Sequence, residues 1–409
     1  MREYIIGPIT QLLPMTGLPA KGPISDDQLS VIKEAGIHIR DGVVVEIAPF
    51  ERLVKQAQIP VKELDAEFVG LPGFIDCHTH ICYAGSRARD FAMRIAGKTY
   101  LEIAKEGGGI WDTVTSTRQA DEDLLLSDLK YRAKLLLARG ITTIEVKSGY
   151  GLDLEGELKM LRVIQRAQRA LKVDLVPTCL AAHIVPKEFK GNVGGYLDMI
   201  ISELFPILKS ENLTKRIDAF IEDEAYTPEN IKPYLDAAQR MGMDITLHAD
   251  QFSSGGSALG VRYGAVSVDH LEASGPKEIE LLGNSDTVAV VLPGASIGLG
   301  CNFAPARAIL DAGGQVAIAS DWNPGSAPMG DLLTQASILA TFQKLSNAEV
   351  LAGITSRAAK ALNNDDIGVL SNTKNADLIL FEVGDYREIL YRQGGLSPKL
   401  IIKNGIMVE

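Results

Sequence analysis

Hydrophobic residues in the middle of the chain fall into eight short runs that are rich in β-branched side chains. Such runs are typical of buried strands, and several of the segments between them show the spacing of amphipathic helices. Strand–helix alternation repeated eight times predicts a (β/α)8 barrel of the TIM type. The eight predicted strands are 73–77, 141–146, 173–180, 217–221, 244–247, 265–268, 287–292 and 315–319.

Three of the intervening segments are predicted to be helices. The first two, 121–139 and 154–171, carry apolar residues at helical spacing, and Gly140 ends the first of them. A third helix is expected over 228–241, with Thr227 as its N-cap and proline at its first position. The intervals 253–264 and 299–314 show no clear pattern, so the count of eight units rests mainly on the strands.

The two ends of the chain differ from the middle. Residues 35–48 read as a hairpin whose two-residue turn is Asp41-Gly42, and 376–381 and 400–408 also have strand character. Two strand-rich ends around a barrel predict a small β-sandwich domain built from both. The expected division is 1–68 plus 365–409 for this composite domain and 69–364 for the barrel.

Composition narrows the class of protein further. Of 409 residues, 46% are hydrophobic and 23% charged, which is ordinary for a globular protein. The net charge of −11 argues against binding nucleic acid or an acidic membrane surface. No segment reads as a membrane span or a secretory signal, and the four cysteines form no CxxC pair. We therefore expect a cytoplasmic protein with neither nucleic acid nor membrane as a partner.

Histidines are concentrated at the ends of the predicted strands. Of six in the chain, five lie there, and the sixth, His38, falls in the N-terminal hairpin and is expected to be structural. Catalytic groups of a TIM-type barrel sit at the carboxyl ends of its strands. One such histidine is readily explained as a hydrogen-bonded structural residue, but five on one rim indicate a functional site. The strand-end residues are His78, His80, His183, His248, His270 and, after strand eight, Asp321.

The segment His78-Thr-His80 indicates the chemistry of that site. Side chains two residues apart on a strand point to the same side, so both imidazoles can reach one ion. A third histidine and an aspartate from other strands would complete a set that suits zinc and also iron. An open position on the metal would hold a water molecule whose pKa falls toward about 7, which gives hydroxide at neutral pH. We expect one divalent or trivalent metal ion, zinc or iron.

Longer motifs carry a resemblance to a known family. Leu71-Pro-Gly-Phe-Ile-Asp-Cys-His-Thr-His80 is similar to the corresponding segment of the amidohydrolase superfamily, whose members also carry a β accessory domain. More closely, the chain resembles the imidazolonepropionase family, which hydrolyses 4-imidazolone-5-propanoate to N-formimidoyl-L-glutamate in histidine degradation. The motifs concerned are Gly107-Gly-Gly-Ile110, Glu145-Val-Lys-Ser-Gly-Tyr-Gly151, Ala181-Ala-His183, His248-Ala-Asp-Gln251, Val268-Asp-His-Leu-Glu272 and Ser320-Asp-Trp-Asn-Pro-Gly-Ser326.

The resemblance implies roles for individual residues. The implied metal ligands are His78, His80, His248 and Asp321, and Asp321 would also receive the proton of the attacking water. His270 would hold that water or polarise the ring, and Arg87 would clamp a substrate carboxylate, as a guanidinium fork can. The implied contacts to the rest of the substrate are Tyr100, Tyr150, His183, Asn323, Gly325 and Ser326. Taken alone, Arg87 also fits a solvated loop, and the tyrosines fit simple packing.

Two positions separate members of the superfamily. Dinuclear members carry a bridging lysine or carboxylate at the end of strand four, where this chain has no lysine; we favour one metal, with Glu222 or Asp223 as remaining candidate ligands. Lys147 follows strand two and is expected in a salt bridge or at the substrate. Gln251 is placed beside the reacting ring with His270 and Asp321. Glutamine cannot act as a general base, which counts against deamination of a ring.

The sequence therefore predicts a metal-dependent hydrolase of C–N bonds in cyclic amides or amidines. Its substrate is expected to be a small molecule with a carboxylate, and a homodimer is the default assembly. Two alternatives stay open. One is a related mononuclear amidohydrolase or deaminase acting on another small heterocycle, and the other is a non-catalytic metal-containing protein that binds a ligand.

Overall fold

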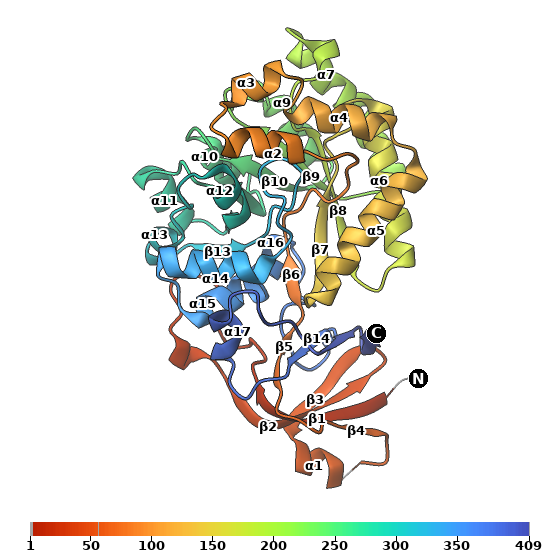
Figure 1. The fold of residues 1–409 in the computed structure, drawn as a ribbon, viewed down its shortest axis with the longest axis vertical. Coiled ribbons are helices and arrows are strands. Elements are labelled where there is room, and N and C mark those ends of the chain that lie inside the picture. Colours follow the sequence, from red (N-terminus) through yellow and green to blue (C-terminus); the bar gives the residue numbers. More distant parts are fainter. Residues whose placement is uncertain (1–2, 56, 409) are drawn as a thin grey trace.

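Eight parallel strands form the centre of the molecule, shown in the computed structural model of Figure 1, which describes residues 3–55 and 57–408. They are hydrogen-bonded in sequence order, so each strand neighbours the next one along the chain. The prediction of a barrel with these eight strands is confirmed. The strands are β6 (Phe74–Asp76), β7 (Ile141–Lys147), β8 (Asp174–Ala182), β9 (Arg216–Ile221), β10 (Asp244–Ala249), β11 (Ser267–His270), β12 (Val288–Val291) and β13 (Gln315–Ile318).

The barrel closes just past the carboxyl ends of its first and last strands. Thr79 forms a parallel bridge with Trp322, and the backbone N–H of Asp321 donates to the carbonyl of His78 over 3.1 Å. The N–H of Ser320 donates to Oδ1 of Asp76 over 2.9 Å. Closure therefore depends on the same two segments that carry the predicted metal ligands His78, His80 and Asp321.

Helices surround the strands, and two of the predicted ones are confirmed. Helix α5 (Glu122–Ala138) begins after Asp121, whose carboxylate accepts the N–H of Leu124 and so caps the first turn. Helix α6 (Leu154–Ala170) buries its apolar side against β8 and α5. The remaining barrel helices include α7 (Val193–Met199), α8 (Phe205–Ser210), α10 (Gly256–Arg262), α11 (Pro276–Gly283), α12 (Pro293–Leu299), α13 (Ala306–Asp311), α14 (Leu332–Gln343), α15 (Asn347–Gly353) and α16 (Ser356–Ala361), with a 3-10 turn at Lys187–Phe189 and a π-helical turn at Ile200–Leu204.

The start of the third predicted helix was wrong. Helix α9 runs over Lys232–Arg240, and the residues before it form a turn. Thr227 caps that turn by accepting the N–H of Asn230 through its hydroxyl, over 3.3 Å. The chain carries a second proline, Pro233, in the first turn of the real helix. Both prolines satisfy the same positional preference, so sequence alone did not tell the two starts apart.

The two ends of the chain share a second sheet, at the bottom of Figure 1. Its central strand β1 pairs with β2, β4 and β5, and β5 pairs antiparallel with β14. The turn Asp41-Gly42 joins β2 to β3 with φ values of 48° and 88°, which suits a tight hairpin. The elements are β1 (Glu3–Leu12), a 3-10 turn (Asp26–Gln28), β2 (Ile32–Arg40), β3 (Val43–Pro49), α1 (Phe50–Lys55), β4 (Val61–Glu63), β5 (Val69–Pro72), β14 (Leu378–Phe381), α17 (Arg387–Tyr391), β15 (Leu400–Lys403) and β16 (Ile406–Val408).

These strands agree with the predicted small β domain. His38 lies on β2, where its Nε2 is 2.8 Å from Oε1 of Glu3, in keeping with a structural role. The domain boundaries at 68/69 and 364/365 stay a prediction, and β5 belongs by its hydrogen bonds to the small sheet. In the described part of the chain, no helix is both long and apolar enough to span a bilayer.

Three short helices cover the end of the barrel that faces away from the small sheet (Figure 1). They follow β6 in the chain and are α2 (Ala88–Ile95), α3 (Tyr100–Lys105) and α4 (Ile110–Gln119). Because they come from the long connection after the first strand, they cross over the carboxyl ends of the barrel strands. The site described below lies beneath them.

Candidate metal and substrate site

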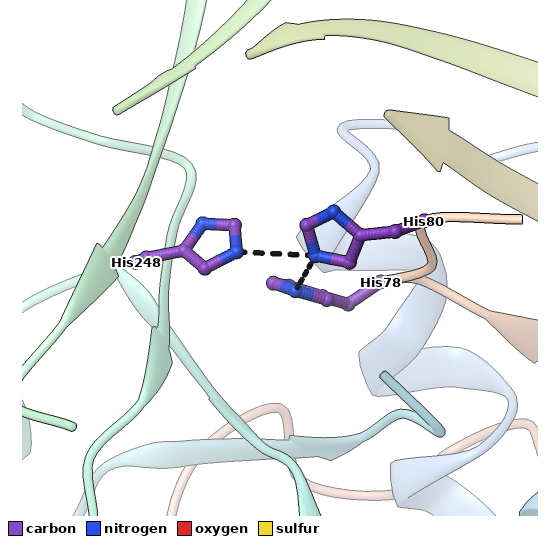
Figure 2. Close-up of side chains that lie close together, drawn as sticks. All are labelled: His78, His80 and His248. Carbon is purple, nitrogen blue, oxygen red and sulfur yellow. Dashed lines mark hydrogen bonds between the residues drawn. The ribbon is translucent and has the colours of Figure 1, made fainter. Parts of the chain in front are cut away.

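Three imidazole rings meet at the carboxyl end of the barrel (Figure 2). Nε2 of His80 lies 3.2 Å from Nε2 of His78 and 3.2 Å from Nε2 of His248. His78 and His80 follow β6, and His248 lies on β10, across the barrel. All three side chains are buried. The predicted histidine cluster is therefore brought together by strands one and five.

Buried carboxylates fix the other ring nitrogen of two of these histidines. Nδ1 of His78 lies 2.6 Å from Oδ2 of Asp269, and Nδ1 of His248 lies 2.9 Å from Oδ2 of Asp218. Because a carboxylate beside Nδ1 favours keeping the ring proton on that nitrogen, each ring presents a bare Nε2 to the centre of the cluster. Burial lowers the pKa of both imidazoles, that of His248 to about 3, so the rings are neutral.

The fourth predicted ligand lies at the same point. Oδ1 of Asp321 is 3.5 Å from Nε2 of His78 and 3.4 Å from Nε2 of His80, and it has no hydrogen-bond donor among the described residues. Asp321 is held in a left-handed backbone conformation with φ of 53°, just where the barrel closes. Burial raises the pKa of this carboxyl group to about 7.

This donor set fits a metal ion. Three nitrogens and one oxygen converge, two of the nitrogens are bare acceptors, and the carboxylate oxygen is unpaired. One proton on Nε2 of His80 could satisfy a single neighbour at most, so the cluster as a whole needs a cation. Nε2 of His80 lies 3.2–3.4 Å from each of the other three donor atoms, and Nε2 of His78 lies 3.5 Å from Oδ1 of Asp321, which are separations of ligands around one small ion. The residues therefore fit one zinc or iron ion.

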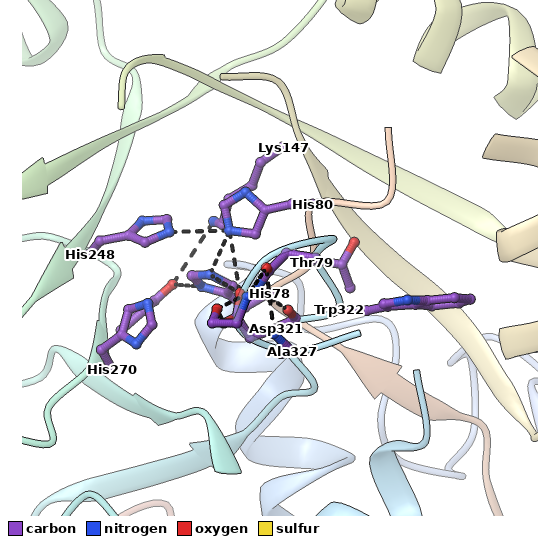
Figure 3. A network of polar contacts seen from close by, with 12 residues as sticks. His78, Thr79, His80, Lys147, His248, His270, Asp321, Trp322 and Ala327 are labelled. Atoms are coloured by element: carbon purple, nitrogen blue, oxygen red, sulfur yellow. Dashed lines mark hydrogen bonds and ion pairs between the residues drawn. The ribbon is translucent and has the colours of Figure 1, made fainter. Parts of the chain in front are cut away.

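Lys147 is buried directly behind the histidines (Figure 3). Its Nζ lies 2.8 Å from Oε1 of Glu145, 2.9 Å from Oδ2 of Asp218 and 4.0 Å from Oδ2 of Asp269. Burial would lower the pKa of Lys147, but the carboxylates of Asp218 and Glu145 raise it above its ordinary value. Lys147 therefore stays cationic, and it forms the salt bridge expected from its place after strand two.

His270 ends β11 beside the cluster, in a left-handed conformation with φ of 89°. Its Nδ1 lies 3.5 Å from Oε2 of Glu272. Burial alone would lower the pKa of His270, but Glu272 and Asp321 raise it above the ordinary histidine value. Among the histidines around the metal site, His270 is thus the one whose environment favours a bound proton, which suits a group that transfers protons.

A cavity of about 270 Å³ opens in front of these residues. His183 and Tyr150 line it, and the ring of His183 stacks on His80 with centroids 5.6 Å apart. Nδ1 of His183 donates a hydrogen bond to the carbonyl of Gly149 over 2.9 Å, which fixes the orientation of the ring. Burial lowers the pKa of His183 to about 4. Both side chains lie where the sequence placed them. The side chain of Tyr100, the remaining predicted tyrosine, lies outside the described residues.

Gln251 also lines the cavity, on a loop after β10 that Glu222 organises. Oε1 of Glu222 accepts the N–H groups of Gln251 and Phe252, each over 2.9 Å, and both its carboxylate oxygens accept that of Ser253. Both oxygens of the Glu222 carboxylate therefore accept hydrogen bonds from the loop, and the side chain of Asp223 is exposed to solvent. Neither of these two candidate ligands is among the groups of described residues that could hold a metal ion.

The turn after β13 forms another wall of the cavity. Oδ1 of Asn323 accepts the N–H groups of Gly325 and Ser326 over 2.7 and 2.8 Å. All three residues line the cavity, and their contact with a substrate stays a prediction. The amide of Asn323 also donates to the Asp321 carbonyl over 2.8 Å, so the turn is tied to the metal-site aspartate.

Arg87 lies at the start of α2 and lines the cavity next to Gly325 of this turn. Its Nε pairs with the carboxylate of Asp90, and its Nη1 donates weakly to Thr113 over 3.4 Å. Sequence reasoning missed Arg94 and Lys98, which line the same cavity from the same segment. Arg94 lies seven residues after Arg87, two helical turns on, and that spacing was the signal that could have found it.

The fold and this site define the class of protein. Residues 69–408 match the model of the amidohydrolase family, and the chain belongs to it. Within that family it belongs with the imidazolonepropionases. It is 42% identical over 367 residues to the imidazolonepropionase of Paracoccus denitrificans, covering 89% of this chain and 92% of that protein. It is 36% identical over 418 residues to that of a Geobacillus species, covering 100% and 98% of the two chains.

Solved structures agree on the fold. An atrazine chlorohydrolase from Arthrobacter aurescens in complex with zinc superposes with a TM-score of 0.70 at 15% identity, covering 99% of this chain and 94% of that one. An adenosine deaminase from Xanthomonas campestris with bound zinc gives 0.70 at 17%, covering 99% and 92%. At this identity they inform on fold alone. From its family, this chain is a hydrolase that acts on C–N bonds of a cyclic substrate.

Proposed function

We propose that this protein hydrolyses 4-imidazolone-5-propanoate to N-formimidoyl-L-glutamate with a single zinc or iron ion. The observation that carries this is the cluster of His78, His80 and His248, with Asp321 beside it, next to a cavity whose lining includes two guanidinium groups. The curated relatives, aligned over nearly the whole chain, are imidazolonepropionases. A small ring with one carboxylate matches the size and charge of the cavity.

The reaction adds the oxygen of water to the ring carbonyl carbon and breaks the adjacent C–N bond. When bound, the metal ion supplies an acidified water as nucleophile and polarises the carbonyl group. Asp321 takes the proton of that water and passes it toward the leaving ring nitrogen. His270 donates a hydrogen bond to the carbonyl oxygen and stabilises its developing charge, in keeping with its raised pKa.

Other residues bind and orient the substrate. We assign Tyr150, His183 and Gln251 to the ring and Arg87 to the propanoate carboxylate, which the planar guanidinium can hold through two N–H groups. The turn formed by Asn323, Gly325 and Ser326 would close the side of the ring, and we keep Tyr100 as a substrate contact. Glutamine at position 251 supplies hydrogen bonds without a titrating group, which favours hydrolysis over deamination.

Purified protein loaded with zinc or iron tests the proposal. Fresh imidazolone propionate should lose its ring absorbance and yield formimidoylglutamate, and His248→Ala should abolish both the turnover and the bound metal. Removal of the metal should stop the reaction, and zinc or iron should restore it. Turnover by the metal-free protein would overturn the mechanism. No turnover by folded, metal-replete protein would redirect the assignment to another small heterocycle or to ligand binding without catalysis.

We also propose a cytoplasmic homodimer, in line with the absence of CxxC pairs and with the frequency of two-fold symmetric oligomers. Sedimentation equilibrium of the holoenzyme would test this assembly. A monomer over the micromolar range would contradict it.

A further inference from the structure

Three cationic side chains line the substrate cavity, and they differ in how their charge is compensated. They are Arg87, Arg94 and Lys98, all from the segment that contains α2. The guanidinium of Arg87 pairs with the buried carboxylate of Asp90, and the ammonium of Lys98 pairs with Glu106. Among the described residues, no carboxylate lies within ion-pair distance of Arg94. It therefore carries the uncompensated positive charge of this wall.

The pairing of Arg87 is firmly built. Both partners are nearly inaccessible to solvent, and Asp90 also accepts the N–H of Gly109 over 2.8 Å. A substrate carboxylate at Arg87 would therefore approach an ion pair of zero net charge. Arg87 can still donate hydrogen bonds, but a neutral pair attracts an anion far less than a free cation does. In a chain of net charge −11, a local cation has to supply that attraction.

Arg94 is placed to do so. It is half-buried, and its Nη2 donates to the carbonyl of Gly325 over 3.2 Å, which holds it against the turn after β13. Its Nε is buried and has no hydrogen-bond acceptor among the described residues. Burial and the neighbouring Arg87 lower the pKa of Arg94, and Asp90 offsets part of this effect. An anion between the two guanidinium groups could accept from the unpaired Nε of Arg94.

We propose that Arg94 is the charge-bearing half of a two-arginine clamp, and that it selects substrates with a carboxylate over neutral analogues. Arg87 contributes directed hydrogen bonds, and Arg94 contributes the net positive charge. The proposal rests on the assigned hydrolysis of imidazolone propionate and names the residue that recognises its side chain. Arg94 already contacts Gly325, so a carboxylate bound to Arg94 would also connect α2 to the turn that contains Asn323 and Ser326.

Kinetics of three variants test this inference. Arg94→Met keeps an unbranched side chain and removes the guanidinium with its charge. We expect its KM for imidazolone propionate to rise about tenfold or more, because the substrate carboxylate loses its net counter-charge, while kcat changes little. Arg94→Lys should recover part of the loss. Arg89→Met is the matched control, because Arg89 is an exposed cation of the same helix that pairs with Glu106 and is not among the residues that line the cavity.

A binding experiment separates selectivity from simple structural support. Calorimetry of the zinc-loaded protein would compare 3-(imidazol-4-yl)propanoate, a non-hydrolysable probe, with its neutral propanamide. The wild type should prefer the carboxylate, and Arg94→Met should lose that preference while the amide binds as before. A variant that keeps the preference, or that weakens both ligands equally, would overturn the role of Arg94. If the wild type binds neither probe and does not turn over the substrate, the proposed function itself fails.

Discussion

Nζ of Lys147 lies 2.9 Å from Oδ2 of Asp218, the same oxygen that lies 2.9 Å from Nδ1 of His248. One carboxylate oxygen thus links a buried ammonium to a metal-binding imidazole. Inside the barrel, the ammonium of Lys147, the carboxylate of Asp218 and the neutral ring of His248 thus form a continuous chain of contacts. Every group in it is shielded from solvent, so none can be removed without leaving its neighbours uncompensated.

Replacing Lys147 with methionine should therefore be severe. The carboxylates of Glu145, Asp218 and Asp269 would lose their shared counter-charge, and we expect the free energy of unfolding to fall by about 3–5 kcal/mol. Urea unfolding of the metal-free protein measures this without interference from the ion. Lys172→Met, at an exposed position before β8, is the control and should change little. Equal stability of the two variants would contradict the role given to the buried cation.

Asp218→Asn probes the metal site, in addition to the stability that Asp218 contributes through Lys147. Asparagine keeps the shape but holds the Nδ1 proton of His248 less strongly, so the ring becomes a poorer donor to the metal. We expect zinc affinity to fall about 10–100-fold, measured by competition with a chelator. Asp286→Asn, at an exposed surface pair with Lys21, should leave affinity unchanged. Wild-type affinity in the Asp218 variant would show that the carboxylate does not tune the ligand.

Glu222→Gln separates loop support from metal binding. The carboxylate accepts backbone N–H groups from the loop that contains Gln251, and an amide has only one oxygen to accept them. The unfolding free energy should fall by about 1.5–3 kcal/mol and KM should rise. Bound metal, counted by elemental analysis, should stay at one ion per chain. Loss of that ion would make Glu222 a ligand after all.

The four cysteines should differ sharply in reactivity. Cys77, Cys82 and Cys179 are buried, and burial raises the pKa of Cys82 to about 12, whereas Cys301 is exposed. An aromatic disulfide reagent should therefore modify one thiol per native chain and four after denaturation. Burial and Glu272 raise the pKa of Cys301, so its reaction should keep accelerating as the pH rises past 9. A variant Cys301→Ser should no longer react in the native state. Modification of one thiol per native chain in this variant would contradict the assignment of the reactive thiol to Cys301.

The sequence predicted the barrel because its strands are short buried runs that begin and end at clear breaks, such as the run that became β12. It predicted the histidine cluster because residues at the ends of parallel strands must meet on one rim. The start of α9 was mistaken because Pro228 and Pro233 fit the same helix rule. Only the tertiary structure decides which of the two turns continues as a helix.

The sequence did not show which charged side chains pair with one another. Arg87 was recognised as a candidate clamp, but its pairing with Asp90, three residues later, depends on helix α2, which the sequence analysis did not predict. Arg94 was overlooked because its place in the cavity depends on how α2 packs against the turn at Gly325, a contact between distant segments. In the same way, the order of Lys147, Asp218 and Asp269 depends on three different strands. Local pattern identifies chemical groups, whereas packing decides which of them remain free to act.

The pairing of β5 with β14 also has a consequence for how the protein is made. β5 runs almost directly into β6, the strand that leads to His78 and His80, yet its partner Leu378–Phe381 is synthesised several hundred residues later. Until then one edge of β5 is uncovered, and sheet contacts of such long sequence separation form slowly. A chain interrupted before β14 would present a bare apolar strand edge next to an unfinished barrel. Nascent chains whose synthesis stalls before residue 378 should therefore be captured by chaperones, or aggregate, more than chains that stall after β14.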